Sequence, residues 1–509
     1  MSVMAVELGA SRLLAPYFSS SQIVWTIIIG TIMIAMALGN VWGGRSADRD
    51  PNPDRLYGRL LIAAVWIAAI PVLGKYVIVL ISGLLIVTIS SRFLVIAAFL
   101  SCMVIFVFPL FLLGTVTPSL AKYTVGRLED SGRTIGALGA YNTIGSIIGT
   151  FVPTFLTIPA VGTSVTFLIF AGILFVLALI YFVCEKKSPV KCIAAALLLA
   201  VCCVCGRSTA FAFWESGLTY EGESVYNYLQ VRDTPKSTIL STNVLFGVQS
   251  ITMKGDSLTG MYYDYALAAP MMAEKAESVL VLGMGTGTYA SQCSRYFEGM
   301  EIEGVEIDEK ITGLAHEYFS LPEDIPVTTY DGRAFLEAAD RTYDVIMVDA
   351  YQDITIPFQM SSIEFFMLVQ KHLNPGGVMV VNMNMHAAEG TTDINTYLAD
   401  TISAVFENVY TVDVPGCTNR ELFASNAVDL PGSLAARAAA SENAELRELM
   451  GRVEDGLCAY ESTGCLLTDD KAPVELLGMQ VIDSLIENEI GYYKDIFREQ
   501  GIQGLLDSL

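Results

Sequence analysis

The first 206 residues contain long apolar runs with almost no charge, and this feature constrains the fold of the chain most. Five such runs cover residues 23–43, 94–113, 135–158, 165–184 and 192–206. At 1.5 Å per residue, each is about long enough to cross a hydrocarbon core of roughly 30 Å. A further run, residues 60–89, is interrupted by Pro71, Gly74 and Lys75. It is either one crossing plus an interfacial segment or a tight hairpin. We therefore expect residues 1–206 to form a polytopic transmembrane domain of about six or seven helices.

Charge divides the chain at the same place. Residues 1–206 carry 13 Lys and Arg against 7 Asp and Glu, whereas the remaining residues carry 17 against 46. Because binding to nucleic acid rests on neutralising phosphates with basic side chains, the acidic second part argues against a nucleic-acid partner. An acidic surface is compatible with a polycationic substrate.

The second part of the chain changes its periodicity twice. Residues 214–250 alternate apolar and polar side chains between turns, which predicts a few short antiparallel strands, and we assign residues 207–270 to a small β-segment and connector. Residues 271–509 alternate strand and helix patterns, which predicts a mostly parallel sheet covered on both faces. The expected fold is a polytopic α-helical membrane domain followed by a Rossmann-like α/β domain of the methyltransferase type.

Four predicted strands between residues 278 and 353 each end in a loop suited to a nucleoside. The first loop carries Gly283, Gly285 and Gly287, and a glycine-rich turn after a buried strand lets backbone approach a ligand closely. Glu306 follows at the end of the next strand, about 20 residues on, where a carboxylate can accept both ribose hydroxyls. The turn has the G-x-G-x-G spacing and therefore differs from the dinucleotide fingerprint. This G-x-G-x-G spacing favours S-adenosyl sulfonium compounds as ligands. The later strand ends contribute Asp331, Gly332 and Asp349.

The cysteines and histidines give no metal-ligand pattern. Six of the ten cysteines lie in or beside the apolar runs, where they behave as small hydrophobic residues, and the three histidines are scattered. We expect no metal cofactor.

These motifs carry a resemblance to a known family. The soluble half resembles the spermidine synthase family of aminopropyltransferases, and the whole chain resembles its membrane-fused bacterial relatives with a transporter-like first domain. In the membrane half the resemblance rests on ELGASRLLAPYF at residues 7–18, GGRSADR at 43–49 and TVTP at 115–118. Such relatives begin with more of the first helix, so we expect the printed sequence to begin late.

The resemblance implies roles for individual residues. Glu306 would hold the ribose, Asp331 and Gly332 would meet the adenine, and Asp349 would position and deprotonate the attacking amine. Catalysis then consists of aligning an amine nitrogen with the carbon on an activated sulfonium and keeping that nitrogen unprotonated. By the same resemblance the donor loop comprises Gly283, Gly285, Thr286 and Gly287, and the amine side comprises Asn227, Tyr262, Tyr263 and Asp353.

Several of these positions depart from the family pattern. Thr286 stands where the soluble family has an aspartate that grips the aminopropyl ammonium. Asn227 replaces a glutamine, and Tyr262 and Tyr263 stand where the family has a tyrosine followed by histidine or glutamine. The loop from Asp349 to Asp353 is one residue longer. The residues expected to bind the nucleoside therefore match the family pattern, whereas those expected to bind the amine differ from it.

Three functions remain open from the sequence. The first is aminopropyl transfer from decarboxylated S-adenosylmethionine to an amine such as putrescine. The second is methyl transfer from intact S-adenosylmethionine, which Thr286 favours because a missing carboxylate removes repulsion against the methionine carboxylate. The third is a membrane transporter or sensor that binds a nucleoside or polyamine without turnover. The expected partners are an amine substrate and the lipid bilayer, and a homodimer is left open.

Two arguments about the side of the membrane disagree. Residues 45–59, 122–133 and 185–191 are rich in Lys and Arg, and short loops of this kind are expected in the cytoplasm. If residues 60–89 cross the membrane once, all three basic segments can be cytoplasmic. The last apolar run then places the soluble domain outside the cell membrane. Sulfonium donors, however, are made in the cytosol. We expect a multi-pass protein of the cell membrane with a cytoplasmic catalytic domain, because substrate supply is a harder constraint than a charge bias. A hairpin at 60–89 gives this side at the cost of placing residues 122–133 and 186–191 outside, and a re-entrant last run gives it without that cost.

Overall fold

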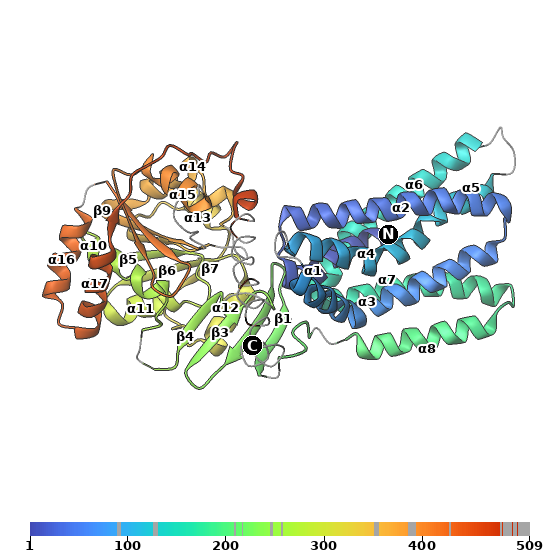
Figure 1. Cartoon of the computed structure of the whole chain (residues 1–509), viewed down its shortest axis with the longest axis horizontal. Coiled ribbons are helices and arrows are strands. Elements are labelled where there is room, and N and C mark those ends of the chain that lie inside the picture. Colours follow the sequence, from blue (N-terminus) through green and yellow to red (C-terminus); the bar gives the residue numbers. More distant parts are fainter. Residues whose placement is uncertain are drawn as a thin grey trace.

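The computed structural model consists of a helical bundle and an α/β domain that lie side by side along the long axis of the molecule (Figure 1). It describes residues 1–88, 93–125, 131–207, 210–215, 217–244, 248–255, 258–350, 356–384, 393–426 and 429–478, and the single positions 481, 491 and 496. The α/β domain is a Rossmann-like domain with a mixed sheet, as the sequence predicts.

The bundle consists of α-helices and one π-helical turn. They are α1 (Ser2–Phe18), α2 (Gln22–Arg49), α3 (Pro53–Thr88), α4 (Phe93–Gly114), α5 (Val116–Thr124), α6 (Ser131–Val152), η2 (Pro153–Thr157), α7 (Ile158–Cys184) and α8 (Pro189–Cys205). Helices α6 and α7 belong to one continuous helical stretch that turns back on itself near Gly162, whose φ of 79° is non-helical.

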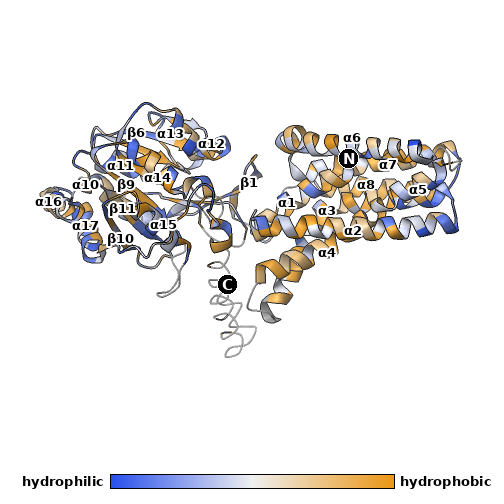
Figure 2. Cartoon of the chain, turned by 90° about the horizontal axis from the view of Figure 1, so that it is seen from above, coloured by the Kyte–Doolittle hydropathy of each residue, from blue (hydrophilic) through white to orange (hydrophobic). Residues whose placement is uncertain are grey.

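The helices of the bundle consist largely of hydrophobic residues (Figure 2), and many of their apolar side chains are exposed on the surface of the bundle. Leu84 and Leu197 are each 64% exposed and Val204 is 76% exposed. Among the described residues, four helical stretches are long and apolar enough to cross a membrane, namely Gln22–Arg49, Pro53–Leu85, Phe93–Thr124 and Ser131–Cys184, and Pro189–Cys205 is a shorter apolar helix. Since exposed apolar surface of this extent is unfavourable in water, the bundle is compatible with membrane association.

The run at residues 60–89, as far as Thr88, lies within the single helix α3. Pro71 lies inside this helix and does not end it. Of the two interpretations of this run, the structure therefore has the single helix, and the hairpin that would favour a cytoplasmic catalytic domain is wrong. Helix α8 likewise runs continuously over 17 residues, from the end of the bundle where α7 ends to the connector of the α/β domain (Figure 1).

The three basic segments meet at one end of the bundle. The Lys122 ammonium pairs with Asp48 at 2.9 Å, and the Lys187 ammonium pairs with Asp54 at 3.1 Å. The hydroxyl of Tyr123 donates to the carbonyl of Asn52. The α/β domain lies at the opposite end of the bundle (Figure 1).

The β-segment forms the part of the α/β domain nearest to the bundle (Figure 1). It is a four-stranded antiparallel sheet in the order β1 (Leu218–Glu223), β2 (Tyr228–Asp233), β3 (Ser237–Ser241), β4 (Ser250–Met253). These strands fall within residues 207–270, where the sequence pattern predicts them.

The main sheet has eight strands in the order β12-β10-β11-β9-β8-β5-β6-β7. Strands β5 to β9 pair in parallel, and β10, β11 and β12 pair antiparallel at one edge. The strands are β5 (Ser278–Leu282), β6 (Glu301–Glu306), β7 (Val327–Thr329), β8 (Tyr343–Val348), β9 (Leu373–Met383), β10 (Asn408–Asp413), β11 (Arg420–Ser425) and β12 (Cys458–Ala459).

Helices cover both faces of this sheet (Figure 1). Every residue of β5 and β8 is buried, which explains the unbroken apolar stretches at residues 279–282 and 345–348 within these strands. One face packs in a core with Val279, Val345 and Val380, and the other with Leu280, Ile346 and Val381. The helices are α9 (Tyr262–Ala266), α10 (Ala268–Met272), α11 (Thr288–Tyr296), α12 (Glu309–Tyr318), α13 (Gly332–Ala338), η3 (Phe358–Met360), α14 (Ile363–Lys371), α15 (Ile394–Ser403), α16 (Leu430–Ala440) and α17 (Ala444–Gly456).

Candidate nucleoside site and its buried carboxyl

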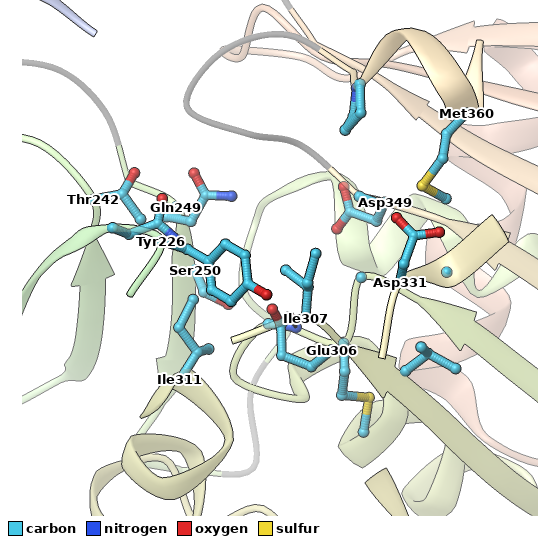
Figure 3. Close-up of a pocket in the computed structure, with 18 of the residues that line it drawn as sticks. Tyr226, Thr242, Gln249, Ser250, Glu306, Ile307, Ile311, Asp331, Asp349 and Met360 are labelled. Atoms are coloured by element: carbon cyan, nitrogen blue, oxygen red, sulfur yellow. Dashed lines mark hydrogen bonds between the residues drawn. The ribbon is translucent and has the colours of Figure 1, made fainter. Parts of the chain in front are cut away.

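A cavity of about 270 Å³ lies at the carboxyl ends of β5, β6 and β8, where the β-segment faces the main sheet. This is the place where ligands bind in open α/β sheets. Figure 3 shows Tyr226, Thr242 and Gln249 on the side of the β-segment, Asp331 and Asp349 on the side of the sheet, and Glu306 between them. Four loops predicted from the sequence are thus brought to one cavity.

The glycine turn after β5 needs glycine for two separate reasons. Gly283, Gly285 and Gly287 have φ angles of 86°, 54° and 79°, which L side chains rarely adopt. A Cβ on Gly283 would also lie 2.5 Å from the carbonyl oxygen of Asp349. Gly283 and Gly285 line the cavity, so the turn presents backbone to whatever occupies it.

Glu306 ends β6 at the floor of the cavity. One carboxylate oxygen accepts from the backbone N–H of Gly285 at 2.8 Å, and the other accepts from the N–H of Asp308 at 3.0 Å. The side chain is buried, and this burial raises its pKa while the backbone donors lower it. The glycine turn and the acidic loop therefore hold each other in place.

Asp331 and Gly332 lie at the start of α13 and line the same cavity. The Asp331 carboxylate caps the helix by accepting from the N–H of Ala334 at 2.9 Å. This is a structural role for the side chain, and it leaves a second carboxylate oxygen beside the cavity.

Asp349 follows β8 and is held by two side-chain donors. The Tyr262 hydroxyl donates to Oδ2 at 2.6 Å, and the Asn382 amide donates to Oδ1 at 2.8 Å. Burial raises the pKa of Asp349 to about 7, although both hydrogen bonds lower it and the charge of Glu306 raises it further. A carboxyl that titrates near neutral pH can accept a proton during a reaction and release it afterwards.

Tyr262 and Tyr263 both come from the short helix α9, and their rings lie 4.0 Å apart between centroids. Tyr263 lines the cavity, and its hydroxyl donates to the Gln249 carbonyl at 3.3 Å and lies 3.2 Å from the Ser250 hydroxyl. Tyr262 instead reaches Asp349. The two adjacent tyrosines thus have different partners.

Thr286 is fully buried behind the cavity wall. Its hydroxyl lies 2.6 Å from that of Ser250, and Ser250 lines the cavity at this point. Asn227 also lines the cavity, and its amide donates to Asp308 at 3.2 Å. Asp353, predicted for the amine side, lies outside the described residues.

Sequence reasoning did not identify Glu421, Asn382, Gln249 or Ser250. Glu421 on β11 is directly opposite Asn382 in the strand register and is 0% exposed. Within the described part of the chain, neither of its carboxylate oxygens has a hydrogen-bond partner. Burial, and next the charge of Asp349, raise its pKa well above the ordinary value. The available signal was a glutamate directly before the apolar residues 422–424 of this strand.

The sheet, the glycine turn and the acidic strand ends together define a Rossmann-like α/β domain with a candidate nucleoside site. Comparison with known proteins identifies its family. A model of the spermine/spermidine synthase domain matches residues 261–424. A probable polyamine aminopropyl transferase of Bifidobacterium longum is 54% identical over 349 residues, covering 64% of this chain and 77% of that protein.

More distant similarity extends to other members. The polyamine aminopropyltransferase of Vibrio vulnificus is 25% identical, covering 55% of this chain and 98% of that protein. The crystal structure of a probable spermidine synthase from Corynebacterium glutamicum aligns with a TM-score of 0.38 at 18% identity, over 46% of this chain and 94% of that one. The chain belongs to the polyamine aminopropyltransferase (spermidine synthase) family of enzymes.

Proposed function

We propose that this enzyme transfers an aminopropyl group from decarboxylated S-adenosylmethionine to an amine such as putrescine, with Asp349 as the base. The observation that carries the proposal is the half-buried carboxyl of Asp349 that lines the cavity, held by Tyr262 and Asn382 with a pKa raised to about 7. Membership of an enzyme family argues against the non-catalytic transporter or sensor.

The nucleoside half of the donor fits the residues of the cavity. In this proposal the ribose hydroxyls donate to Glu306, the adenine meets Asp331 and Gly332, and the turn at Gly283 and Gly285 lets the sulfonium approach the backbone. Glu306 already accepts two backbone N–H donors, and a carboxylate has room for about four, so two hydroxyls can be added.

The reaction needs one displacement and one proton transfer. The lone pair of the acceptor nitrogen attacks the aminopropyl carbon on sulfur, the C–S bond breaks, and methylthioadenosine leaves with the bonding electrons. The nitrogen loses one proton to Asp349. An aliphatic amine with a pKa of about 10 is mostly charged at neutral pH, and a carboxylate within hydrogen-bond reach of the nitrogen can take its proton as the attack proceeds.

The amine side of the site is proposed to include Tyr262, Tyr263, Asn227 and Asp353. The position of Tyr263 supports this best, because its ring lines the cavity beside Ser250 and Gln249. Tyr262 would act through Asp349, to which it donates.

Methyl transfer from intact S-adenosylmethionine is the second candidate. It is favoured by the hydroxyls of Ser250 and Thr286 at the position where the soluble family has a carboxylate. Hydroxyls can donate to the methionine carboxylate, whereas an aspartate would repel it.

We further propose that the helical bundle is embedded in the lipid bilayer and that the catalytic domain is cytoplasmic. The apolar outer surface of the bundle supports the first part. Substrate supply supports the second, because the donor is made in the cytosol. The single helix α3 and the three basic segments at the far end of the bundle argue for the opposite side under the positive-inside rule. A homodimer stays a prediction.

Product analysis with a panel of acceptors tests the proposal. Full-length protein in lipid nanodiscs is incubated with each of the two donors and with diamines, triamines and monoamines, and the amine products are identified by mass spectrometry. Aminopropylated amines from the decarboxylated donor support the proposal. Methylated products that form only from the intact donor would support the second candidate instead.

A further inference from the structure

Helix α1 of the bundle contacts a turn that forms part of the nucleoside cavity. The Arg12 guanidinium donates to the carbonyl of Ser224 at 3.2 Å and to the carbonyl of Val225, both in the connection between β1 and β2. This connection continues into Tyr226 and Asn227, which line the cavity. A charged group of the bundle therefore fixes the backbone at the edge of the candidate site.

The same turn is bonded to the loop that holds Glu306. The Ser224 hydroxyl and the Asn227 amide both donate to one carboxylate oxygen of Asp308. The backbone N–H of Asp308 in turn donates to Glu306. A continuous series of hydrogen bonds thus runs from Arg12 through Ser224 and Asp308 to the carboxylate proposed to bind the ribose.

A second contact of α1 reaches the connection that follows β3 of the β-segment. The Pro16 carbonyl accepts from the backbone N–H of Val244 at 2.9 Å. Val244 follows β3 closely, and Thr242 of the same connection lines the nucleoside cavity. Two separate connections of the β-segment are therefore both attached to one helix of the bundle.

The space between α1 and the β-segment is a second cavity of about 210 Å³. Its walls include Ser11, Arg12 and Pro16 of the helix and Tyr226, Asn227 and Thr242 of the β-segment. The last three residues also line the nucleoside cavity, so the two cavities share a wall. A displacement of α1 would move that wall directly.

We propose that α1 is a positioning element of the nucleoside site, in which Arg12 and the Pro16 carbonyl hold the β1–β2 and β3–β4 connections in place for donor binding. The bundle is then part of the catalytic unit as well as an anchor, and donor affinity depends on the position of a bundle helix. The inference rests on the proposed nucleoside site but not on which group is transferred. Arg12 is a positioning residue, since it acts through Ser224 and Asp308.

Substitution of Arg12 tests this role in the full-length protein in nanodiscs. Calorimetry with methylthioadenosine measures nucleoside affinity, and steady-state kinetics separate KM from kcat. We expect Arg12→Ala to weaken methylthioadenosine binding and to raise the donor KM by about tenfold, because charge-assisted hydrogen bonds to the turn are lost. The kcat at saturating donor should stay within about threefold. Arg12→Lys should recover part of the affinity.

Lys75→Met is the matched control. The Lys75 ammonium also links the bundle to the connector, by donating to the Ala210 carbonyl at 2.6 Å, but that carbonyl is not part of the cavity wall in the described chain. The affinity of the Lys75→Met variant for methylthioadenosine should equal that of the unsubstituted protein. The proposal would be overturned if Arg12→Ala bound methylthioadenosine as tightly as the unsubstituted protein does. It would also be overturned if Lys75→Met lost as much affinity as Arg12→Ala.

Ser224→Ala provides a second route if Arg12→Ala does not fold. This variant keeps the carbonyl that Arg12 contacts but removes the hydroxyl that reaches Asp308. It should weaken the nucleoside to a similar extent, and a double-mutant cycle with Arg12→Lys should be non-additive. Unchanged affinity in Ser224→Ala, or additive effects, would contradict the series of contacts. If the unsubstituted protein fails to bind methylthioadenosine, the proposed function fails instead.

Discussion

The Tyr262 hydroxyl donates to the carboxylate of Asp349 at 2.6 Å, and the tyrosine is buried whereas Asp349 is half-buried beside the cavity. Burial raises the pKa of Asp349 to about 7, and this hydrogen bond works in the opposite direction by stabilising the charged form. The tyrosine therefore favours the charged, proton-accepting form of the proposed base.

The first prediction concerns the pH profile of this pair. Below a pH of about 7 Asp349 is protonated and cannot accept a proton, so kcat/KM should fall with decreasing pH. Tyr262→Phe removes a donor to the charged form, which raises the pKa of Asp349 and should move this acid limb to higher pH. Tyr265→Phe on the same helix is the control and should leave the limb in place. An unmoved limb in Tyr262→Phe would contradict the assignment of the base.

The second prediction separates the base from the nucleoside pocket. Asp349→Asn should abolish turnover while leaving methylthioadenosine affinity within a few-fold. Glu306→Gln should weaken the nucleoside by about 10- to 150-fold, since a charge-assisted pair worth roughly 1.5–3 kcal/mol is lost. Calorimetry measures both variants. Equal losses of affinity would show that the two carboxylates do not have separate roles.

The third prediction concerns the choice of donor. Thr286 lies behind Ser250, so Thr286→Asp introduces a negative charge next to the cavity wall in a buried environment. This charge should repel the carboxylate of intact S-adenosylmethionine and increase the preference for the decarboxylated donor by about tenfold. Competition binding of the two donors measures the ratio, and Thr286→Val is the uncharged control. An unchanged ratio would place the donor tail away from Ser250.

The fourth prediction concerns the side of the membrane. A reporter fused at the C-terminal end of the printed sequence should behave as cytoplasmic. Cys417, Cys458 and Cys465 should stay reduced in protein purified without reductant, as expected for thiols in a reducing compartment. An externally active reporter together with a disulfide among these cysteines would place the catalytic domain outside, as the basic segments favour, and would remove the cytosolic donor from the account.

The fold could be predicted from local patterns to a large extent. Uncharged runs indicate helices of membrane length, and fully apolar strands such as Val279–Leu282 indicate a sheet buried on both faces. The continuity of α3 could not be predicted, because a proline such as Pro71 is tolerated inside an apolar membrane helix but can also mark a turn. Because of the same ambiguity, the sequence did not determine on which side of the membrane the last helices end.

The nucleoside loops could also be located from sequence, because each is a strand end followed by a glycine or carboxylate. The partners of these residues could not. Thr286 and Ser250 meet over 36 residues of chain, and Asn382 reaches Asp349 over 33, so both contacts depend on the packing of separate strands. Arg12 and Ser224 are further apart still, at 212 residues, and nothing local connects them.

The nucleoside product of a single turnover tests the central claim most directly. Full-length protein in nanodiscs is mixed with decarboxylated S-adenosylmethionine and putrescine, and with the intact donor and putrescine, and the nucleosides are separated by chromatography. Aminopropyl transfer predicts methylthioadenosine and spermidine in equal amounts from the first mixture, with neither formed by Asp349→Asn. Formation of S-adenosylhomocysteine from the second mixture, with no methylthioadenosine from the first, would contradict the account.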